Sequence, residues 1–276
     1  MKPESDDLIA RLKAQALETR RFLVDHTVHH GTHLGGALSA TDILTALYFH
    51  FMRVRPQDPD WEERDNFILS KGHVGIALYH VLAKRGFFPV GDLKTYEQIG
   101  TIFGTHPSNK IPGVDVTTGS LGHGLSVGAG LAIVGKKDAK SYRVYVMLGD
   151  GELQEGSVWE ATMAASSHKL DNLVAIVDRN RFQGGEMTEK ILTLEPIDEK
   201  FRAFGWSPSV IDGNDMEQIV QTLGALPFEK DKPSVIIANT IKGKGVSFIE
   251  NKAESHLLML SEAQAQQALE QLEVAP

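Results

Sequence analysis

Short apolar runs alternate with segments of helical spacing along most of the chain. Runs at residues 67–69, 144–148, 173–177 and 235–238, with a weaker one at 210–211, have the length of buried strands. Between them, apolar residues recur every three or four positions, as on a helix with one buried face. Strands that alternate with helices are typical of a parallel sheet covered by helices. The pattern therefore predicts an α/β fold with a mainly parallel central sheet flanked by helices.

Further helices are expected at both ends of the chain and after two capping motifs. Residues 6–30 are helix-prone, and a last helix is expected from about Ser261. A capping box places two polar side chains three positions apart where a helix begins. The capping pairs are Ser39 with Asp42 and Asp215 with Gln218, and the apolar stripes are Ile43, Leu44, Leu47, Tyr48 and Phe51; Val74, Ala77, Leu78, Val81 and Leu82; Val158, Trp159, Thr162 and Met163; and Met216, Ile219, Val220 and Leu223.

The length of the chain, 276 residues, is sufficient for a large hydrophobic core. Domains commonly contain about 150 residues, so the length allows one large domain or two small ones. No internal repeat or low-complexity linker divides the sequence. We therefore expect residues 1–276 to form a single domain.

Charge and cysteine content exclude several classes of function. The chain has 28 basic and 36 acidic residues, a formal net charge of -8, so it lacks the basic surface that nucleic acids or anionic membranes require. It contains no cysteine, which excludes a thiol nucleophile, an Fe–S cluster and a disulfide scaffold. A chain without cysteine is compatible with a reducing compartment, and we expect a cytoplasmic location.

Neither a secretory signal nor a membrane span is expected. Residues 1–7 are polar and acidic, without the apolar segment of a signal peptide. Residues 116–135 are uncharged over 20 positions, the length of a membrane helix. Six of these residues are glycine and several others are polar, so we reject a membrane span there.

Polar side chains follow two successive strands of the predicted sheet. Gly149-Asp150-Gly151 comes after one strand, and Asp178-Arg179-Asn180 follows the next. Strands joined through a helix run parallel and end at the same edge, about 4.8 Å apart if they are neighbours. A carboxylate and an amide oxygen meeting there suit Mg²⁺ or Ca²⁺, with phosphate oxygens as further ligands. A turn with a capping aspartate is the simpler reading of Gly-Asp-Gly alone, but the paired asparagine favours a metal site.

Glycine-rich loops and histidines form two further signals. Residues 117–124 are rich in glycine, which lets a ligand approach the backbone or a helix pack closely. His33, His73 and His106 lie beside glycines in loops, and histidine moves protons near neutral pH. For five other histidines we expect surface or capping positions: His26, His29, His50, His80 and His168.

Together these motifs resemble the transketolase family, in its thiamine-diphosphate-binding N-terminal part. The resemblance covers nearly the whole chain. The matching segments are His33-Leu34-Gly35-Gly36-Ala37-Leu38-Ser39-Ala40, Leu69-Ser70-Lys71-Gly72-His73, Thr118-Gly119-Ser120-Leu121-Gly122, Gly149-Asp150-Gly151 with Glu155-Gly156 and Trp159-Glu160-Ala161, Asp178-Arg179-Asn180, Phe204-Gly205-Trp206 and Lys242-Gly243-Lys244-Gly245-Val246-Ser247-Phe248.

The resemblance implies thiamine diphosphate and Mg²⁺ as cofactors, with Ca²⁺ or Mn²⁺ as substitutes for the metal. Asp150, Asn180 and the carbonyl of Phe182 would hold the metal, and Gly151 would contact the diphosphate. The reaction implied is transfer of a two-carbon ketol unit from a ketose to an aldose, normally as phosphates.

Other matched residues would surround the cofactor and the substrate. Lys242 and His73 would face the diphosphate. Gly119, Ser120 and Leu121 would line the cofactor through backbone groups, and His33, His106 and His256 would surround the reacting carbon and the donor sugar, with His256 also contacting the cofactor.

Two segments depart from the family pattern. After Asn180 the family usually has an isoleucine and an Asp-Gly pair, whereas this chain has Gly184-Gly185-Glu186. His256 is flanked by Ser255 and Leu257 in place of the usual tryptophan and glycine, so it matches less closely than the other histidines.

The chain ends where the first domain of longer family members ends. Those members carry the glutamate that activates the aminopyrimidine, and most of the phosphate-binding residues, in a second part. The resemblance therefore implies a partner subunit that supplies these groups, in a heterotetramer with two copies of each chain. The sequence leaves open the donor sugar, including sulfonated or branched sugar phosphates, and two alternatives: an inactive regulatory paralogue and a synthase of the deoxyxylulose phosphate type.

Overall fold

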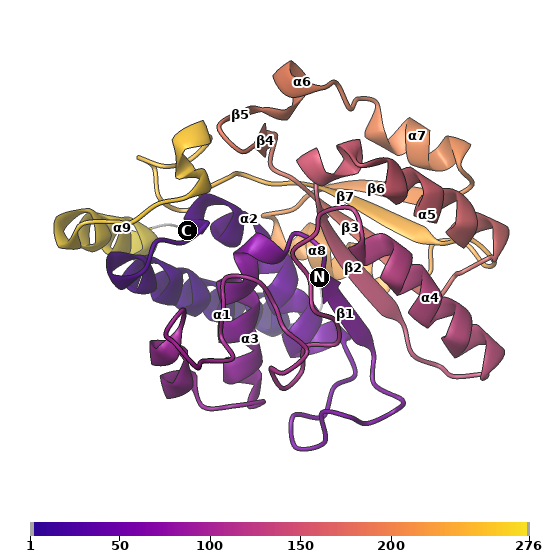
Figure 1. Cartoon of the computed structure of the whole chain (residues 1–276), viewed down its shortest axis with the longest axis horizontal. Helices are drawn as coiled ribbons and strands as arrows, with labels where there is room; N and C mark the ends of the chain where they lie inside the picture. The colour runs from indigo at the N-terminus through magenta and orange to yellow at the C-terminus, as the bar shows by residue number, and fades with distance from the viewer. Residues whose placement is uncertain (1–2, 275–276) are drawn as a thin grey trace.

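A five-stranded parallel sheet forms the centre of the molecule (Figure 1). The structure is a computed structural model that describes residues 3–274. The strand order is β1-β2-β3-β7-β6, so the predicted fold class is confirmed. The strands are β1 Asn66–Leu69, β2 Val144–Gly149, β3 Leu173–Arg179, β6 Ser207–Asp212 and β7 Ser234–Asn239, and a small antiparallel hairpin joins β4 Phe182–Gln183 to β5 Glu186–Met187.

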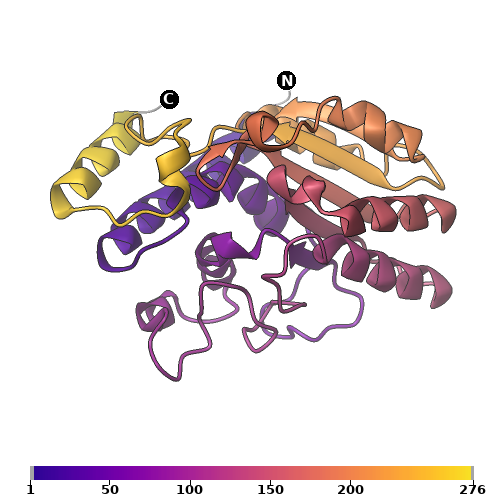
Figure 2. The same ribbon diagram turned by 45° about the horizontal axis from the view of Figure 1, so that its top comes forward.

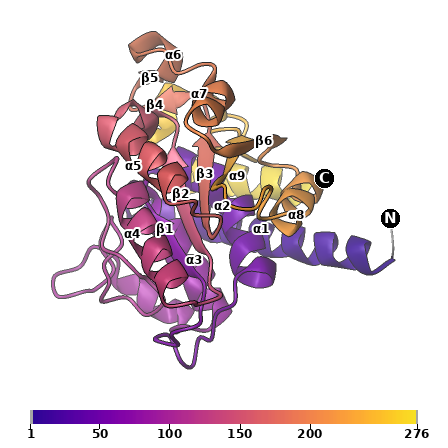
Figure 3. The same cartoon turned by 90° about the vertical axis from the view of Figure 1, so that its right-hand side faces the viewer.

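Helices cover both faces of the sheet, which Figure 3 shows between the two layers. One layer contains α4 Gly124–Lys137, α5 Gly156–Ser167 and α7 Ile197–Ala203. The other contains α1 Pro3–His29, α2 Leu34–Ala46, α3 Gly75–Arg85, α8 Met216–Gly224 and α9 Glu262–Val274. Short helical turns complete the chain: η1 Leu47–Phe51, η2 Gly72–Val74, η3 Val90–Thr95, η4 Gly151–Gln154, α6 Thr188–Ile191 and η5 Ala253–His256.

Successive residues of β3 enter opposite cores. Val174 and Ile176 pack in the core under α1, α2 and α3, whereas Ala175 and Val177 pack under α4 and α5. All four are fully buried. A strand covered on both faces can be apolar at every position, which explains why these strands appear in the sequence as continuous apolar runs.

The C-terminal helix and the second capping box form as expected. Figure 2 shows α9 in yellow beside the indigo N-terminal helix, and Ala265 and Leu272 of α9 are buried in that core. Asp215 accepts hydrogen bonds from the backbone N–H groups of Glu217 (2.9 Å) and Gln218 (3.5 Å) where α8 begins. Within residues 3–274, no helix is long and apolar enough to cross a membrane.

The first expected cap was wrong, because α2 begins at Leu34 rather than at Ser39. Ser39 lies inside the helix, where its hydroxyl donates to the carboxylate of Asp178 at 2.6 Å. Two adjacent glycines usually indicate that a helix is interrupted, but Gly35 and Gly36 lie inside α2. Gly35 is in close contact with Ser255. A Cβ atom at Gly35 would lie 2.4 Å from Oγ of Ser255, so packing selects glycine at this helical position.

Two other expectations on helix faces were wrong. Met163 is 57 % exposed, because it lies five residues beyond Val158 and therefore about 140° around the helix from it. Ala161 and Ala165 complete the buried face instead. His80 is buried rather than on the surface: it stacks on Phe22 with ring centroids 4.2 Å apart.

Candidate functional site

The carboxyl ends of β2 and β3 bring Asp150 and Asn180 to one edge of the sheet. The two strands are parallel neighbours in which Gly149 lies opposite Asp178. Asp150 and Asn180 follow these positions and line the same cavity, together with Phe182. Ligands of open α/β sheets bind at this edge. The structure thus brings together the three residues that the sequence predicted as metal ligands.

Asp150 is a buried carboxylate with several donors around it. Its Oδ1 accepts from the backbone N–H of Gly151 at 2.7 Å, and its Oδ2 accepts from the backbone N–H of Arg181 at 2.6 Å and from Nη1 of Arg179 at 2.8 Å. Burial raises the pKa of Asp150, and the Arg179 guanidinium opposes that shift. These contacts fix the direction in which the carboxylate points.

Arg179 is a residue whose role sequence reasoning missed. Its guanidinium bonds Asp150, Glu189 (3.2 Å) and Glu195 (2.9 Å), although its side chain is only 4 % exposed. It thereby ties the end of β3 to the segment after β5. A charged residue directly after a buried apolar run was the available signal.

Asn180 is oriented by the turn that follows it. Its Oδ1 accepts from the backbone N–H of Phe182 at 3.1 Å, and its Nδ2 donates to Oγ of Ser39 at 3.4 Å. Its oxygen is therefore directed to the turn that carries the Phe182 carbonyl. A carboxylate, an amide oxygen and a backbone carbonyl form an all-oxygen donor set, which suits a hard divalent cation.

A second buried ion pair lies behind Asn180. The ammonium of Lys71 bonds the carboxylate of Asp178, and both side chains are almost completely buried. The hydroxyls of Ser39 and Thr240 donate to the same carboxylate. Through these two hydroxyls, the Asp178 carboxylate links α2 and the residue after β7 to the end of β3. Sequence reasoning quoted both charged residues inside motifs but gave neither a role.

Three histidines form a cluster beside this cavity. The ring of His33 lies 5.0 Å from the rings of both His73 and His256, which are 5.6 Å from each other. His73 and His256 line the cavity itself. His256, the least closely matched histidine in the sequence, therefore lies among the others.

His106 stands at the rim, next to the glycine-rich loop. It is exposed, and a Cβ atom at Gly119 would lie 3.2 Å from its Cδ2 atom. Gly119 has a φ of 143°, in the range that favours glycine. Of the loop residues predicted to line a cofactor, Leu121 lines the cavity, whereas Ser120 is exposed and lies 3.2 Å from Nδ1 of His123.

Burial and neighbouring cations depress the pKa values of these histidines. Burial lowers the pKa of His73 to about 2, with a further contribution from Lys71. It lowers the pKa of His256 to about 4, helped by Lys242, and it also lowers the pKa of His33. All three pKa values lie below the ordinary value of histidine, so the neutral form of each ring predominates at pH 7.

Lys242 is the lysine among the residues predicted to bind the cofactor. It lines the cavity, and burial followed by repulsion from Lys71 lowers its pKa to about 8. Its Nζ donates to the carbonyl of Gly184 at 3.5 Å, a weak contact. A cation held without a carboxylate partner in the structure suits a ligand that carries negative charge.

Glu152 connects the two glycine-rich loops, and sequence reasoning missed it. Its Oε1 accepts from the backbone N–H of Gly122 at 2.9 Å, and its Oε2 accepts from that of Gly149 at 3.0 Å. Ser70 donates to the same carboxylate. Burial raises the pKa of Glu152. The backbone N–H groups of the loops are thus positioned by one buried side chain.

Gly151 contacts the neighbouring hairpin. A Cβ atom there would lie 2.8 Å from Cγ of Gln183, so any larger residue would displace this side chain. The Oε1 atom of Gln183 is buried without a hydrogen-bond partner. The hairpin with the unusual Gly184-Gly185-Glu186 sequence therefore forms one wall of the cavity.

Unpartnered polar atoms near the cavity indicate a polar ligand. Nδ1 of His33, Oγ1 of Thr118 and Oε1 of Gln183 are buried and make no hydrogen bond. Buried polar groups normally have partners, so these atoms fit a site completed by a bound group. Within residues 3–274, no three His, Asp or Glu side chains are arranged to hold a metal; the expected donor set differs, with a single carboxylate.

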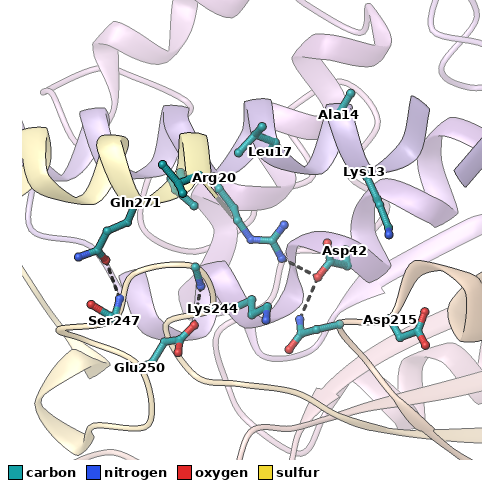
Figure 4. A pocket seen from close by; sticks show the side chains of 14 residues that line it. Lys13, Ala14, Leu17, Arg20, Asp42, Asp215, Lys244, Ser247, Glu250 and Gln271 are labelled. Atoms are coloured by element: carbon teal, nitrogen blue, oxygen red, sulfur yellow. Dashed lines mark hydrogen bonds and ion pairs between the residues drawn. The ribbon is translucent and has the colours of Figure 1, made fainter. Parts of the chain in front are cut away.

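A larger pocket lies elsewhere and contains none of the predicted site residues. It has a volume of about 800 Å³ between α1, α9 and the turn at residues 244–250 (Figure 4). Arg20 reaches into it from α1 and pairs with Asp42 at 2.5 Å. The predicted chemistry therefore belongs to the smaller cavity at the sheet edge.

Fold and site together define a class: α/β proteins with oxygen donors and a lysine gathered in a cavity where parallel strands end. Residues 12–276 match the family model described as "Transketolase, thiamine diphosphate binding domain". The chain belongs to the transketolase family.

Similar proteins include both short subunits and long enzymes. The chain is 44% identical to a subunit of the apulose-4-phosphate transketolase of Phocaeicola vulgatus, over 90% of this chain and 89% of that protein. It is 42% identical to the SqwG subunit of the 6-deoxy-6-sulfo-D-fructose transketolase of a Clostridium species, over 95% and 96%. It is 40% identical to human transketolase over 98% of this chain, but spans only 43% of that protein.

Solved transketolases have the same fold. The structure of the Campylobacter jejuni enzyme superposes with a TM-score of 0.88 and 32% identity, over 95% of this chain and 43% of that one. The chain thus corresponds to less than half of that enzyme.

Proposed function

We propose that this chain is the thiamine-diphosphate-binding subunit of a split transketolase, which transfers a two-carbon ketol unit with the help of a second polypeptide. The observation that carries the proposal is the cavity at the ends of β2 and β3. It gathers an oxygen donor set, two lysines and two histidines from segments far apart in the sequence.

The residues of the cavity fit the cofactor that the family implies. Asp150, Asn180 and the carbonyl of Phe182 would hold Mg²⁺, and Lys242 and His73 would face the diphosphate. Gly119, Ser120, Leu121 and Gly151 would approach the cofactor with backbone groups. When bound, thiamine diphosphate supplies the nucleophilic carbon that the protein itself lacks.

The histidines of the site would move protons at the substrate. With depressed pKa values, His33 and His256 are neutral at pH 7, so either ring is ready to take the proton of a donor hydroxyl. His106 at the rim would bind hydroxyl groups of the sugar. The packed rings of His33, His73 and His256 would also keep water away from the reacting atoms.

A partner chain is part of the proposal. Relatives of the same length are named as subunits, and the full-length enzymes are more than twice as long. We propose that residues 1–276 form a single domain and that the partner contributes the pyrimidine-binding and C-terminal domains. A cytoplasmic heterotetramer, with two copies of each polypeptide, would complete two sites.

The proposed substrates belong to one chemical class, ketoses that carry an anionic group. Two relatives are named for apulose 4-phosphate and for 6-deoxy-6-sulfofructose. We propose that this enzyme likewise acts on ketoses with an anionic group at the end opposite the transferred unit. Unbranched pentose phosphates belong to the same set.

The test is reconstitution. The chain is purified alone and also together with the product of an adjacent gene encoding a C-terminal transketolase half, and both preparations receive thiamine diphosphate and Mg²⁺. We expect ketol transfer only in the mixture. Transfer by the chain alone would contradict the requirement for a partner.

Two other outcomes distinguish the alternatives. A mixture that binds thiamine diphosphate without transferring a ketol unit would identify a regulatory paralogue. Release of CO₂ from pyruvate in the presence of glyceraldehyde 3-phosphate would identify a synthase of the deoxyxylulose phosphate type.

A further inference from the structure

Glu97 is an exposed residue with an unusual backbone conformation in the segment that precedes His106. Its φ is 56°, in the left-handed region that few residues other than glycine adopt. Its backbone N–H donates to the carbonyl of Phe103 at 2.9 Å, which closes a loop over residues 97–103. Strained backbone of this kind is concentrated at functional sites. The contacts of the Glu97 side chain are therefore of interest.

The Glu97 side chain is bonded to the segment that carries His106. The hydroxyl of Thr105, the residue before His106, donates to the Glu97 carboxylate. From the other side, the hydroxyl of buried Tyr79 donates to the carbonyl of Gly104 at 2.9 Å. The residues directly before His106 are thus held by two side chains from different segments.

Glu97 also supplies the negative charge that acts on His33. Burial lowers the pKa of His33, and the charges of His106, Lys71 and Lys242 lower it further, whereas Glu97 raises it. The rings of His73 and His256, which pack against His33, add no negative charge. Of the four charged or titratable neighbours that act most on the pKa of His33, which are His106, Glu97, Lys71 and Lys242, Glu97 is the one that raises it.

We propose that Glu97 is a positioning residue of the ketol transfer: its carboxylate anchors the His106 segment through Thr105 and provides the counter-charge for His33 when that ring takes up a proton. The inference rests on the proposed function, since it assigns a role within the same site. Sequence reasoning missed Glu97 because an isolated acidic residue in an irregular segment carries no motif.

Three variants distinguish the effect of the Thr105–Glu97 hydrogen bond from the effect of the negative charge of Glu97. Glu97→Gln keeps an oxygen acceptor for Thr105 but removes the charge. Thr105→Val keeps the charge but removes the donor. Asp92→Asn, in η3, removes one exposed charge whose carboxylate makes no hydrogen bond in the structure, and it serves as the matched control. Each variant is combined with the partner polypeptide, and kcat and kcat/KM are measured from pH 5 to 9.

We expect Glu97→Gln to lower kcat by roughly three- to tenfold, a fraction of what a general acid–base residue contributes. Because the pKa of His33 then falls, the acid limb of kcat/KM moves to lower pH. Thr105→Val is expected to lower kcat without moving that limb, and Asp92→Asn to change neither. A Glu97→Gln enzyme with the native rate and profile would overturn the proposal, as would an equal shift in Asp92→Asn.

A second measurement does not depend on activity. The pKa of His33 is determined by NMR on the histidine-labelled full chain, with and without Glu97→Gln. A lower His33 pKa in the variant supports the proposal, and an unchanged value overturns it. If the native pair of polypeptides transfers no ketol unit, the proposed function fails while this measurement still decides the role of Glu97.

Discussion

Lys242 sets a pH limit on cofactor binding. Its pKa of about 8 means that it is mostly protonated at pH 7 and mostly neutral at pH 9. A diphosphate binds the protonated form, so affinity for thiamine diphosphate is expected to fall as pH rises through 8. Lys242→Met should weaken binding at pH 7 about tenfold, the effect of about 1.4 kcal/mol, and should remove this pH dependence. Calorimetric titration with Mg²⁺ present measures both.

Lys244→Met is the matched control for that prediction. Lys244 occupies the same motif two residues later but lines the larger pocket rather than the cavity at the sheet edge. The Lys244→Met variant should bind thiamine diphosphate with the affinity of the native chain. Equal loss of affinity in both variants would mean that Lys242 acts through general charge and not by contact.

At the scale of single residues, the sequence predicts a residue's position best where the order of strands and helices determines it. Asp150 and Asn180 meet because parallel strands must end at one edge, and this follows from the order of strands and helices alone. The order of strands and helices does not predict the roles of three other residues, Lys71, Glu152 and Arg179. Their roles depend on which buried carboxylate or N–H lies beside them, and only three-dimensional packing determines that.

At the scale of elements, α2 depends on a glycine at a close contact. Gly35→Ala would place a methyl group 2.4 Å from Oγ of Ser255 and 2.6 Å from its carbonyl oxygen. Overpacking of this kind costs about 1–3 kcal/mol. The variant should lose free energy of unfolding in urea, and displacement of Ser255 should move the adjacent His256.

Gly130→Ala tests the same substitution where space is open. Gly130 lies within helix α4, and nothing lies within 4 Å of the position that its Cβ would occupy. Alanine favours a helix over glycine by about 1 kcal/mol, so this variant should be as stable as the native chain or more stable. Equal stability of the two variants would show that the contact at Gly35 relaxes without cost.

Helix positions were predicted more reliably than helix boundaries and faces. The stripe of α8 and its cap follow from local spacing and local hydrogen bonds, which the sequence contains. The start of α2 and the burial of His80 depend on tertiary contacts, with Ser255 in one case and with Thr19 and Phe22 in the other. Local patterns hold no information about such distant neighbours.

At the scale of the whole molecule, we predict that the proposed partner chain packs on exposed apolar side chains of α4 and α5. Val127 and Val134 on α4 and Met163 on neighbouring α5 are 40 %, 50 % and 57 % exposed. Val127→Asp should leave the stability of the isolated chain nearly unchanged, because the side chain already faces solvent. It should weaken assembly with the second polypeptide by at least about tenfold, the effect of burying one unpaired charge.

Val210→Asp provides the comparison on the same face of the sheet, at the edge strand β6. Val210 is 54 % exposed on the edge strand β6. Light scattering of each variant mixed with the second polypeptide should show normal assembly for Val210→Asp only. Assembly of both variants at native strength would place the partner on another face.

Two segments that are synthesised far apart in time lie side by side at the histidine cluster. Thr32 and Leu258 exchange two backbone hydrogen bonds, of 2.8 and 2.9 Å, and these residues stand next to His33 and two positions after His256. The segment that carries His33 is therefore bonded to one that lies far later in the sequence. Contacts so distant in sequence form late in folding. All five strands of the central sheet end by Asn239, so during synthesis the sheet is complete in sequence before the segment that carries His256 and Leu258.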